Sequence, residues 1–316
     1  MIIFLIASVL ATQPLMATGN GVGVWFVRDT KPGSIGPPHE LCQQIDQESF
    51  QVILPLAKRP AALAVHGQTL WFVGESDPPV LYRARLVKNQ GTGELRIVPP
   101  GRATAVTPLV IQGAVRDLVF IHDEPVLVVE DEGVQCFDLE GKAVTPKLAG
   151  KETHVATQGS TLIGAVSIAN TVVLYTFKDG LWQVGSKHEI DGQLLDLVVH
   201  DGWPLLIVAQ EDAIKIIGLQ QEKQLKIASF PEPSGRWLVV ENDGLHVLGV
   251  ERNGTTTAFD IGWPSGKSTD SIELTEQFGS LETVELVLML ITTAIFFVVM
   301  VLILSRKPKN IKKNDG

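Results

Sequence analysis

Residues 193–230 decide the fold, because they divide into four short apolar segments at a spacing of about ten residues. The segments are QLLDLVVH (193–200), PLLIVAQ (204–210), AIKIIGLQ (213–220) and KQLKIASF (223–230). Each is shorter than a typical helix and rich in Val, Ile and Leu, and turn-forming residues separate it from the next. The stretch therefore predicts four consecutive strands joined by tight turns.

The neighbouring sequence repeats this scheme. The segments before it are THVATQ (153–158), TLIGAVSIA (161–169), TVVLYTF (171–177) and LWQVGSKHEI (181–190), and those after it begin with GRWLVVE, GLHVLGV and TTTAFDI. Asp-Gly pairs at 179–180, 191–192, 201–202 and 243–244, and Asn-Gly pairs at 20–21 and 253–254, tolerate the positive φ that tight hairpins require. The middle of the chain is therefore predicted to be all-β.

A repeat emerges when each unit is aligned on the first apolar residue of its second strand. The aligned residues are Val24, Leu70, Val126, Leu162, Leu205 and Leu245. Most of the intervals fall near the roughly 40–50 residues of a propeller repeat, and the longest contains 89–108, interpreted as an extended loop. The rhythm resembles that of β-propellers in general. It implies about six four-stranded blades over residues 19–280, with the ring closed by residues 11–18 or 271–278. No WD, kelch or Asp-box motif supports this, and a pair of β-sandwiches is the alternative.

One transmembrane helix is predicted to follow. Residues 286–304 (LVLMLITTAIFFVVMVLIL) carry no charge and would span about 28 Å as a helix, close to the ~30 Å hydrocarbon core. The tail 305–316 contains five basic residues, Arg306, Lys307, Lys309, Lys312 and Lys313. Basic residues mark the cytoplasmic side, so the tail is expected to be cytoplasmic and to contact the membrane, and the β-rich body to lie outside the cytoplasm.

The N-terminal segment 1–17 fits a secretory signal or a second apolar anchor. Residues 2–10 (IIFLIASVL) are too short to span a membrane comfortably and match the apolar part of a signal peptide. Cleavage is expected near Ala11 or Ala17, although no basic residue precedes the apolar run. Either outcome leaves the body outside the cytoplasm.

The charge balance limits the partners. The net charge is −9 even though the tail is basic, so the body is more acidic than the whole chain. An acidic body argues against binding nucleic acid. A protein or small-ligand partner outside the cytoplasm is expected, with no cofactor.

Histidines are the most notable candidate site residues. His66, His122 and His200 each follow the first strand of a unit (AVHG, FIHD, VVHD). In a propeller such turns lie on one face around the channel, so three imidazoles could converge as zinc ligands do. The alternative is repeated turn chemistry, because other units have Gln158 and Glu241 at that place. No metal site is predicted from this pattern.

The remaining motifs favour structural interpretations. Residues 262–269 (GWPSGKST) have too few residues between their glycines for a phosphate loop, and the acidic clusters at 130–132 and 241–243 match solvated turns. Cys42 and Cys136 fall in the first and third units, which favours two buried free thiols over a disulfide.

The function expected is that of a membrane-anchored binding or scaffolding module, not an enzyme, since no catalytic motif stands out. Two alternatives remain open. One is an extracytoplasmic hydrolase or lyase with a site built from loops, and the other is the sensory subunit of a membrane complex, for which the span offers only Thr292, Thr293 and Ala294 as small or polar contacts.

Overall fold

The computed structural model describes residues 16–276, apart from short gaps. The gaps are 20–22, 31–32, 34–35, 75, 77, 89–94, 99–102, 110, 151, 211–212, 221–222, 232–235, 242–244, 251–255, 263–264, 266, 268 and 271. The chain forms two compact units, Met1–Glu276 and Gln277–Gly316, and every described residue belongs to the first. Within the described part there is no helix long and apolar enough to cross a membrane, and the predicted span 286–304 lies outside it.

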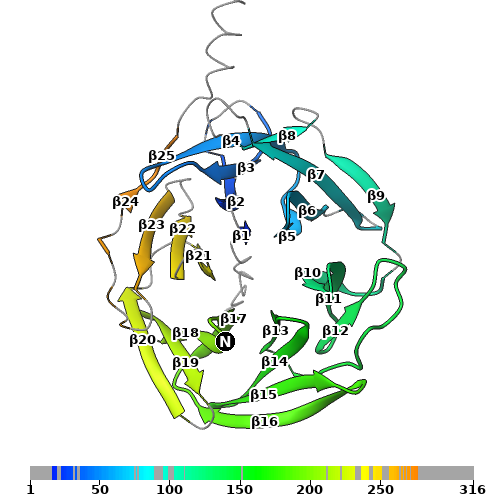
Figure 1. Cartoon of the computed structure of the whole chain (residues 1–316), viewed down its shortest axis with the longest axis vertical. Helices are drawn as coiled ribbons and strands as arrows, with labels where there is room; N and C mark the ends of the chain where they lie inside the picture. The colour runs from blue at the N-terminus through cyan, green and yellow to red at the C-terminus, as the bar shows by residue number, and fades with distance from the viewer. Residues whose placement is uncertain are drawn as a thin grey trace, which may run out of the picture. The chain divides into compact units, whose positions relative to one another are not determined.

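Six sheets follow one another along the chain and are arranged around a common axis as the blades of a propeller (Figure 1). The innermost strands are β1 (Met16–Gly19), β5 (Pro60–His66), β10 (Ala114–Ile121), β13 (Glu152–Gln158), β17 (Gln193–His200) and β21 (Arg236–Glu241). The second strands are β2 (Gly23–Asp29), β6 (Thr69–Gly74), β11 (Glu124–Glu130), β14 (Thr161–Ile168), β18 (Trp203–Gln210) and β22 (Leu245–Val250). The predictions of an all-β body and of six blade-like units are confirmed.

Outside these lie the third and outer strands. The third strands are β3 (His39–Gln44), β7 (Val80–Lys88), β12 (Val134–Phe137), β15 (Thr171–Lys178), β19 (Ala213–Gln220) and β23 (Thr256–Ile261). The outer strands are β4 (Ser49–Leu56), β8 (Leu95–Val98), β9 (Thr104–Pro108), β16 (Leu181–Glu189), β20 (Lys223–Pro231), β24 (Ile272–Glu273) and β25 (Thr275–Glu276). Successive strands within a blade pair antiparallel, while β25 pairs parallel with β4 of the first blade.

Three sheets differ from the predicted four-stranded plan, and in the first the difference is the addition of β25 as a fifth strand. In the second, the stretch 89–108, predicted to be a loop, contains β8 and β9, which pair with different halves of the edge of β7. The third has three strands, and the segment that follows β12 contains Pro146, which has no N–H to donate to a ladder. This segment still pairs with β12 at two isolated bridges, Val134–Leu148 and Phe137–Ala143.

The core consists of apolar clusters between neighbouring blades. Each of the six clusters of buried residues joins two adjacent sheets, and the last of them joins the sixth blade to the first. In β18, Leu205 and Ile207 pack toward the sixth blade, whereas Leu206 and Val208 pack toward the fourth. Since both faces of a blade are buried, strands such as PLLIVAQ are apolar at successive positions instead of alternating.

Two of the four Asp-Gly pairs form hairpin turns within a blade. Asp179 and Gly180 join β15 to β16, and Asp201 and Gly202 join β17 to β18, all with positive φ. The pair at 191–192 instead connects the fourth and fifth blades. There Gly192 has a φ of 132°, and a Cβ at this position would collide with the backbone oxygen of Ala209. The pairs at 20–21, 243–244 and 253–254 fall outside the described residues.

The cysteines are free, as predicted. Cys42 lies in β3 of the first blade and Cys136 in β12 of the third, and both thiols are buried. Burial raises the pKa of both thiols, that of Cys136 to about 12, so each is protonated and unreactive in the folded protein at neutral pH.

Candidate binding site at the inner strands

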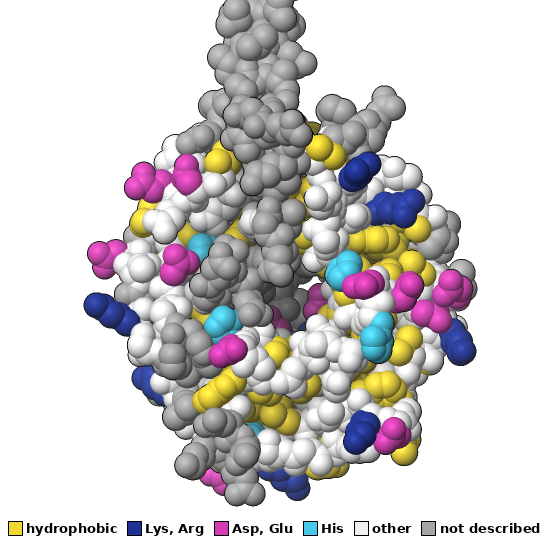
Figure 2. All heavy atoms as spheres, in the orientation of Figure 1, with side chains coloured by type: hydrophobic (Ala, Val, Ile, Leu, Met, Phe, Trp, Pro, Cys, Tyr) yellow, Lys and Arg dark blue, Asp and Glu magenta, His cyan; other side chains and the backbone are white. Residues whose placement is uncertain are grey.

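The predicted histidines lie at the turns that follow the innermost strands, but not at one equivalent position. His66 and His200 are the last residues of β5 and β17 and face Thr69 and Trp203 across their hairpins. His122 lies one residue further along its unit, inside the turn, with a φ of 49°, because Ile121 is the last residue of β10. In Figure 2 the histidine side chains are spread around the visible face instead of gathering at one point.

These turn residues link neighbouring blades. The Nε2 atom of His66 lies 3.0 Å from Oδ1 of Asp123 in the next blade, and its ring stacks on Phe120 with a centroid distance of 4.3 Å. Between the fourth and fifth blades, the side-chain amide of Gln158 donates a hydrogen bond to the backbone oxygen of Gly202. Among the described residues no three or more His, Cys, Asp or Glu side chains are grouped so that they could hold a metal ion.

Three other polar side chains occupy one equivalent position in three successive blades. Asp117 of β10, His154 of β13 and Asp196 of β17 each lie four residues before the last paired residue of their strand. Because side chains alternate along a strand, an even offset from the same end of the strand places all three on the same side of their sheets. The position is therefore polar in the third, fourth and fifth blades, whereas in the second blade it is the buried Ala62.

The backbone around Asp117 and Asp196 has the same local geometry. The pairing register shifts between Val115 and Asp117 and again between Leu194 and Asp196, so each aspartate directly follows a β-bulge. Bulges re-aim the side chains beside them. Oδ1 of Asp117 accepts the N–H of Leu118 and Oδ1 of Asp196 accepts the N–H of Leu197, both at 2.7 Å. One carboxylate oxygen of each residue is thus held by its own strand.

The three side chains influence one another's charge. Nδ1 of His154 lies 3.6 Å from Oδ1 of Asp196, and the two side chains are 10% and 29% exposed. The pKa of Asp117 is raised to about 7, first by burial and then by the negative charge of Asp196, while the N–H of Leu118 and the charge of His154 partly oppose the rise. Ionisable side chains from three inner strands therefore interact electrostatically in a partly buried environment. We call these three residues, Asp117, His154 and Asp196, the inner-strand site.

This arrangement can accept a positive charge. It contains two carboxyl groups and one imidazole, so it is negatively charged whenever both carboxyls are ionised. A cationic group beside Asp117 would offset the repulsion from Asp196 and lower the pKa that burial has raised. Figure 2 shows parts of acidic side chains near the middle of the ring.

A sequence signal for this site existed and was missed. The stretches DLVFIH (117–122) and DLVVH (196–200) share Asp-Leu-Val at the same register, with an aspartate inside an otherwise apolar strand. Aligning the two stretches on their histidines instead hides this match, because the third blade has one more residue before its histidine. The predicted tail contacts Arg306, Lys307, Lys309, Lys312 and Lys313 lie outside the described residues.

Comparison with solved structures supports the fold. The chain is similar to one in the nidogen/laminin complex, with a TM-score of 0.54 and 12% identity over 78% of this chain and 92% of that one. It is also similar to the SapL1 lectin in complex with alpha methyl fucoside, with a TM-score of 0.53 and 12% identity over 83% and 96% of the two chains. No family model matches the sequence, and no curated protein matches it. At these identities the likeness shows a β-propeller-like fold.

Proposed function

We propose that this protein is a membrane-tethered binding module whose body lies outside the cytoplasm and whose inner-strand site holds a positively charged group of a protein or small-molecule partner. The observation that carries the proposal is the convergence of Asp117, His154 and Asp196 from three separate strands at one register position. A carboxylate that is costly to ionise in the free protein is stabilised when a cation binds beside it.

The ring suits a binding role because it is a rigid frame. Six apolar clusters hold the blades to one another, and polar contacts such as His66–Asp123 connect the turns at the ends of the inner strands. Side chains that project from such a frame lose little conformational freedom when a partner binds. The entropy cost of binding is therefore smaller than in a flexible site.

The tether is supported by sequence. The uncharged run 286–304 and the basic tail 305–316 favour a single crossing with the tail in the cytoplasm. At the other end, β1 starts at Met16 and pairs with β2 through Met16, Ala17, Thr18 and Gly19. Cleavage after Ala17 would remove half of this strand, so removal of a signal near Ala11 is the cleavage compatible with the folded ring.

Binding of a cationic probe tests the role of the inner-strand site. A fluorescent penta-arginine peptide is titrated into the full-length protein in detergent at about 0.15 M salt, where distant surface charges are largely screened. We expect Asp117→Asn/Asp196→Asn to weaken binding at least ~10-fold, because the peptide loses its charge partners. Asp179→Asn/Asp270→Asn removes the same charge from exposed positions and should leave binding unchanged. Equal weakening in both double variants would show general attraction to an acidic surface and contradict the proposal.

One observation favours a second candidate function. A carboxyl group with a pKa of about 7 that interacts with the charge of a second carboxyl, as Asp117 does with Asp196, can serve as a general acid at neutral pH while the second carboxyl serves as the base. A hydrolase or lyase would use this pair. Turnover of a substrate that is lost in Asp117→Asn and retained in Asp179→Asn would favour this candidate over simple binding.

A further inference from the structure

One short segment closes the ring. β24 pairs with β23 of the sixth blade, and β25, which follows after one residue, pairs with β4 of the first blade (Figure 1). Between them Leu274 is 4% exposed and packs in the core cluster shared by the first and sixth blades. We call residues Ile272–Glu276 the strap, since they bridge the first and last blades. After Glu276 the chain leaves the ring-forming unit.

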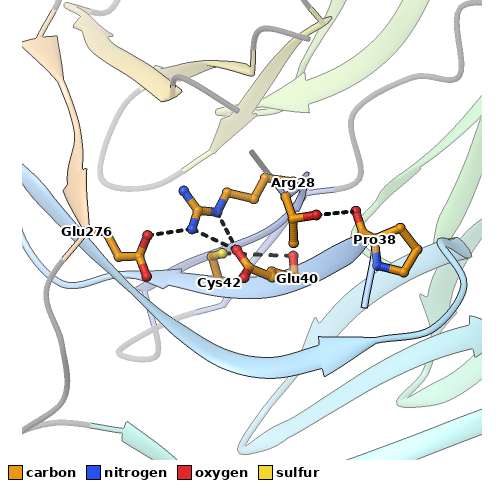
Figure 3. A network of polar contacts seen from close by, with 6 residues as sticks. Arg28, Pro38, Glu40, Cys42 and Glu276 are labelled. Carbon is orange, nitrogen blue, oxygen red and sulfur yellow. Dashed lines mark hydrogen bonds and ion pairs between the residues drawn. The ribbon is translucent and has the colours of Figure 1, made fainter. Parts of the chain in front are cut away.

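An ion pair holds the strap to the first blade. The guanidinium of Arg28 in β2 lies 2.6 Å from the carboxylate of Glu276 and 2.7 Å from that of Glu40 in β3 (Figure 3). Arg28 is only 4% exposed, and its guanidinium lies 4.5 Å from the centre of the Phe50 ring. Glu276 is the strap's contribution to this network, and it comes from 248 positions further along the chain than Arg28.

The other contacts of the strap are few. β24 and β25 have two residues each. Beyond this pairing, Leu274 donates a hydrogen bond to the backbone oxygen of Thr256 at 2.7 Å, and Thr275 donates one to that of Glu48 at 2.8 Å. The other strands of the six blades, in contrast, are four to nine residues long. Segments with few buried contacts open at a lower free energy than the whole fold.

We propose that the strap is a releasable closure: it detaches from the first blade while the six blades stay folded, and the Arg28–Glu276 ion pair controls how often it does so. Release would uncover the edge of β4 and the core cluster beneath Leu274. The ring would then open between its first and last blades, next to the place where the chain continues toward its C-terminus.

The two native cysteines report this opening. Cys42 is fully buried, lies in the same core cluster as Leu274, and is drawn beside Arg28 and Glu40 in Figure 3. Cys136 is equally buried but lies in the third blade, in the cluster shared with the fourth. Release of the strap should expose Cys42 to a thiol reagent, whereas Cys136 should react only when the third or fourth blade unfolds.

Thiol labelling of the full-length protein in detergent tests the proposal. N-ethylmaleimide is added under native conditions, and the modification of each cysteine is followed by mass spectrometry of its peptide. In the wild-type protein we expect Cys42 to react at least ~10-fold faster than Cys136. Glu276→Gln removes the charge that pairs with Arg28 and should speed labelling of Cys42 by a further ~10-fold, with Cys136 unchanged.

The control is Glu273→Gln, which makes the same chemical change at an exposed residue of β24 and should leave both rates unchanged. A second measurement needs no variant. Raising the salt concentration to about 1 M should speed labelling of Cys42 in the wild-type protein, because salt screens the partly exposed Glu276. Equal rates for Cys42 and Cys136 that rise together under every condition would show that the strap opens only on global unfolding, and would overturn the proposal.

Discussion

Arg28→Met is expected to lower the free energy of unfolding by about 2–4 kcal/mol, because it leaves two carboxylates in a largely buried place without their cation. Arg28 is 5% exposed at its side chain, and its partners Glu40 and Glu276 are 20% and 31% exposed. The loss should be smaller than for a fully buried pair, since both carboxylates keep some contact with water. Urea unfolding of the full-length protein in detergent, followed by tryptophan fluorescence, measures the change.

A matched control exists in the third blade. Arg116 also pairs with a glutamate across two neighbouring strands, but both Arg116 and Glu130 are about a third exposed. Arg116→Met should therefore cost less than about 1 kcal/mol. Adding Glu40→Gln and Glu276→Gln to Arg28→Met should recover part of the lost stability, because the unpaired charges are then gone. Equal losses in Arg28→Met and Arg116→Met would contradict the role given to the buried network.

Asp117→Asn is expected to stabilise the protein at alkaline pH. The pKa of Asp117 is raised from 3.8 to about 7 in the folded protein, first by burial and then by Asp196. The folded state therefore holds a proton that the unfolded state has lost between these pH values, and stability falls as the pH rises through this window. A displacement of this size corresponds to about 4 kcal/mol; since Asp117 is only partly buried, we expect a gain of about 2 kcal/mol for the variant at pH 8.

The direction of the stability change and the pH range in which it occurs distinguish this effect from a change in packing. At pH 4 Asp117 is protonated in the folded state, and about 40% of it is still protonated in the unfolded state. Asp117→Asn should therefore change the free energy of unfolding by only about 0.5 kcal/mol there. Asp196→Asn in the wild-type background should shift the midpoint of the pH dependence downward, because it removes the charge that repels the Asp117 carboxylate. Destabilisation by Asp117→Asn that is the same at pH 4 and pH 8 would refute this explanation.

Such a result would also bear on function. A residue whose removal stabilises the fold is retained for another reason, and buried carboxyls with raised pKa are common where proteins bind or react with ligands. The inner-strand site would then join the residues whose cost to stability reflects a role in binding. His154 and Asp196 share this position in the neighbouring blades.

The blade rhythm could be predicted because it depends on local pattern. Segments such as PLLIVAQ and TVVLYTF are short, apolar and bounded by turns, and each pairs with the segment next to it in sequence. Turn chemistry was equally local at Asp179-Gly180 and Asp201-Gly202, where both residues have positive φ. These features need no knowledge of distant contacts.

The strap and the inner-strand site could not be predicted in the same way. Thr275 and Glu276 form a strand only because Ser49 and Phe50 offer them an open edge far away in the sequence. The ion pair between Arg28 and Glu276 likewise joins residues that are far apart in sequence. For Asp117 the local sequence shows an aspartate in a strand, but its raised pKa arises from burial in the folded ring and from the charge of Asp196 two blades further on. Long-range pairing decides these features, and hydrophobic periodicity carries no signal for it.

The most direct test of the proposed function is the identification of what the protein holds in its own membrane. Native membranes are cross-linked, and the tagged full-length protein is solubilised, purified and examined by mass spectrometry, for wild type, Asp117→Asn/Asp196→Asn and Asp179→Asn/Asp270→Asn. The proposal predicts a partner with a basic segment, recovered in near-stoichiometric amount with the wild type and the exposed-site control and lost with the inner-strand variant. A partner retained equally by all three would contradict a binding role for Asp117 and Asp196, and no partner with any of them would contradict a protein partner at this site.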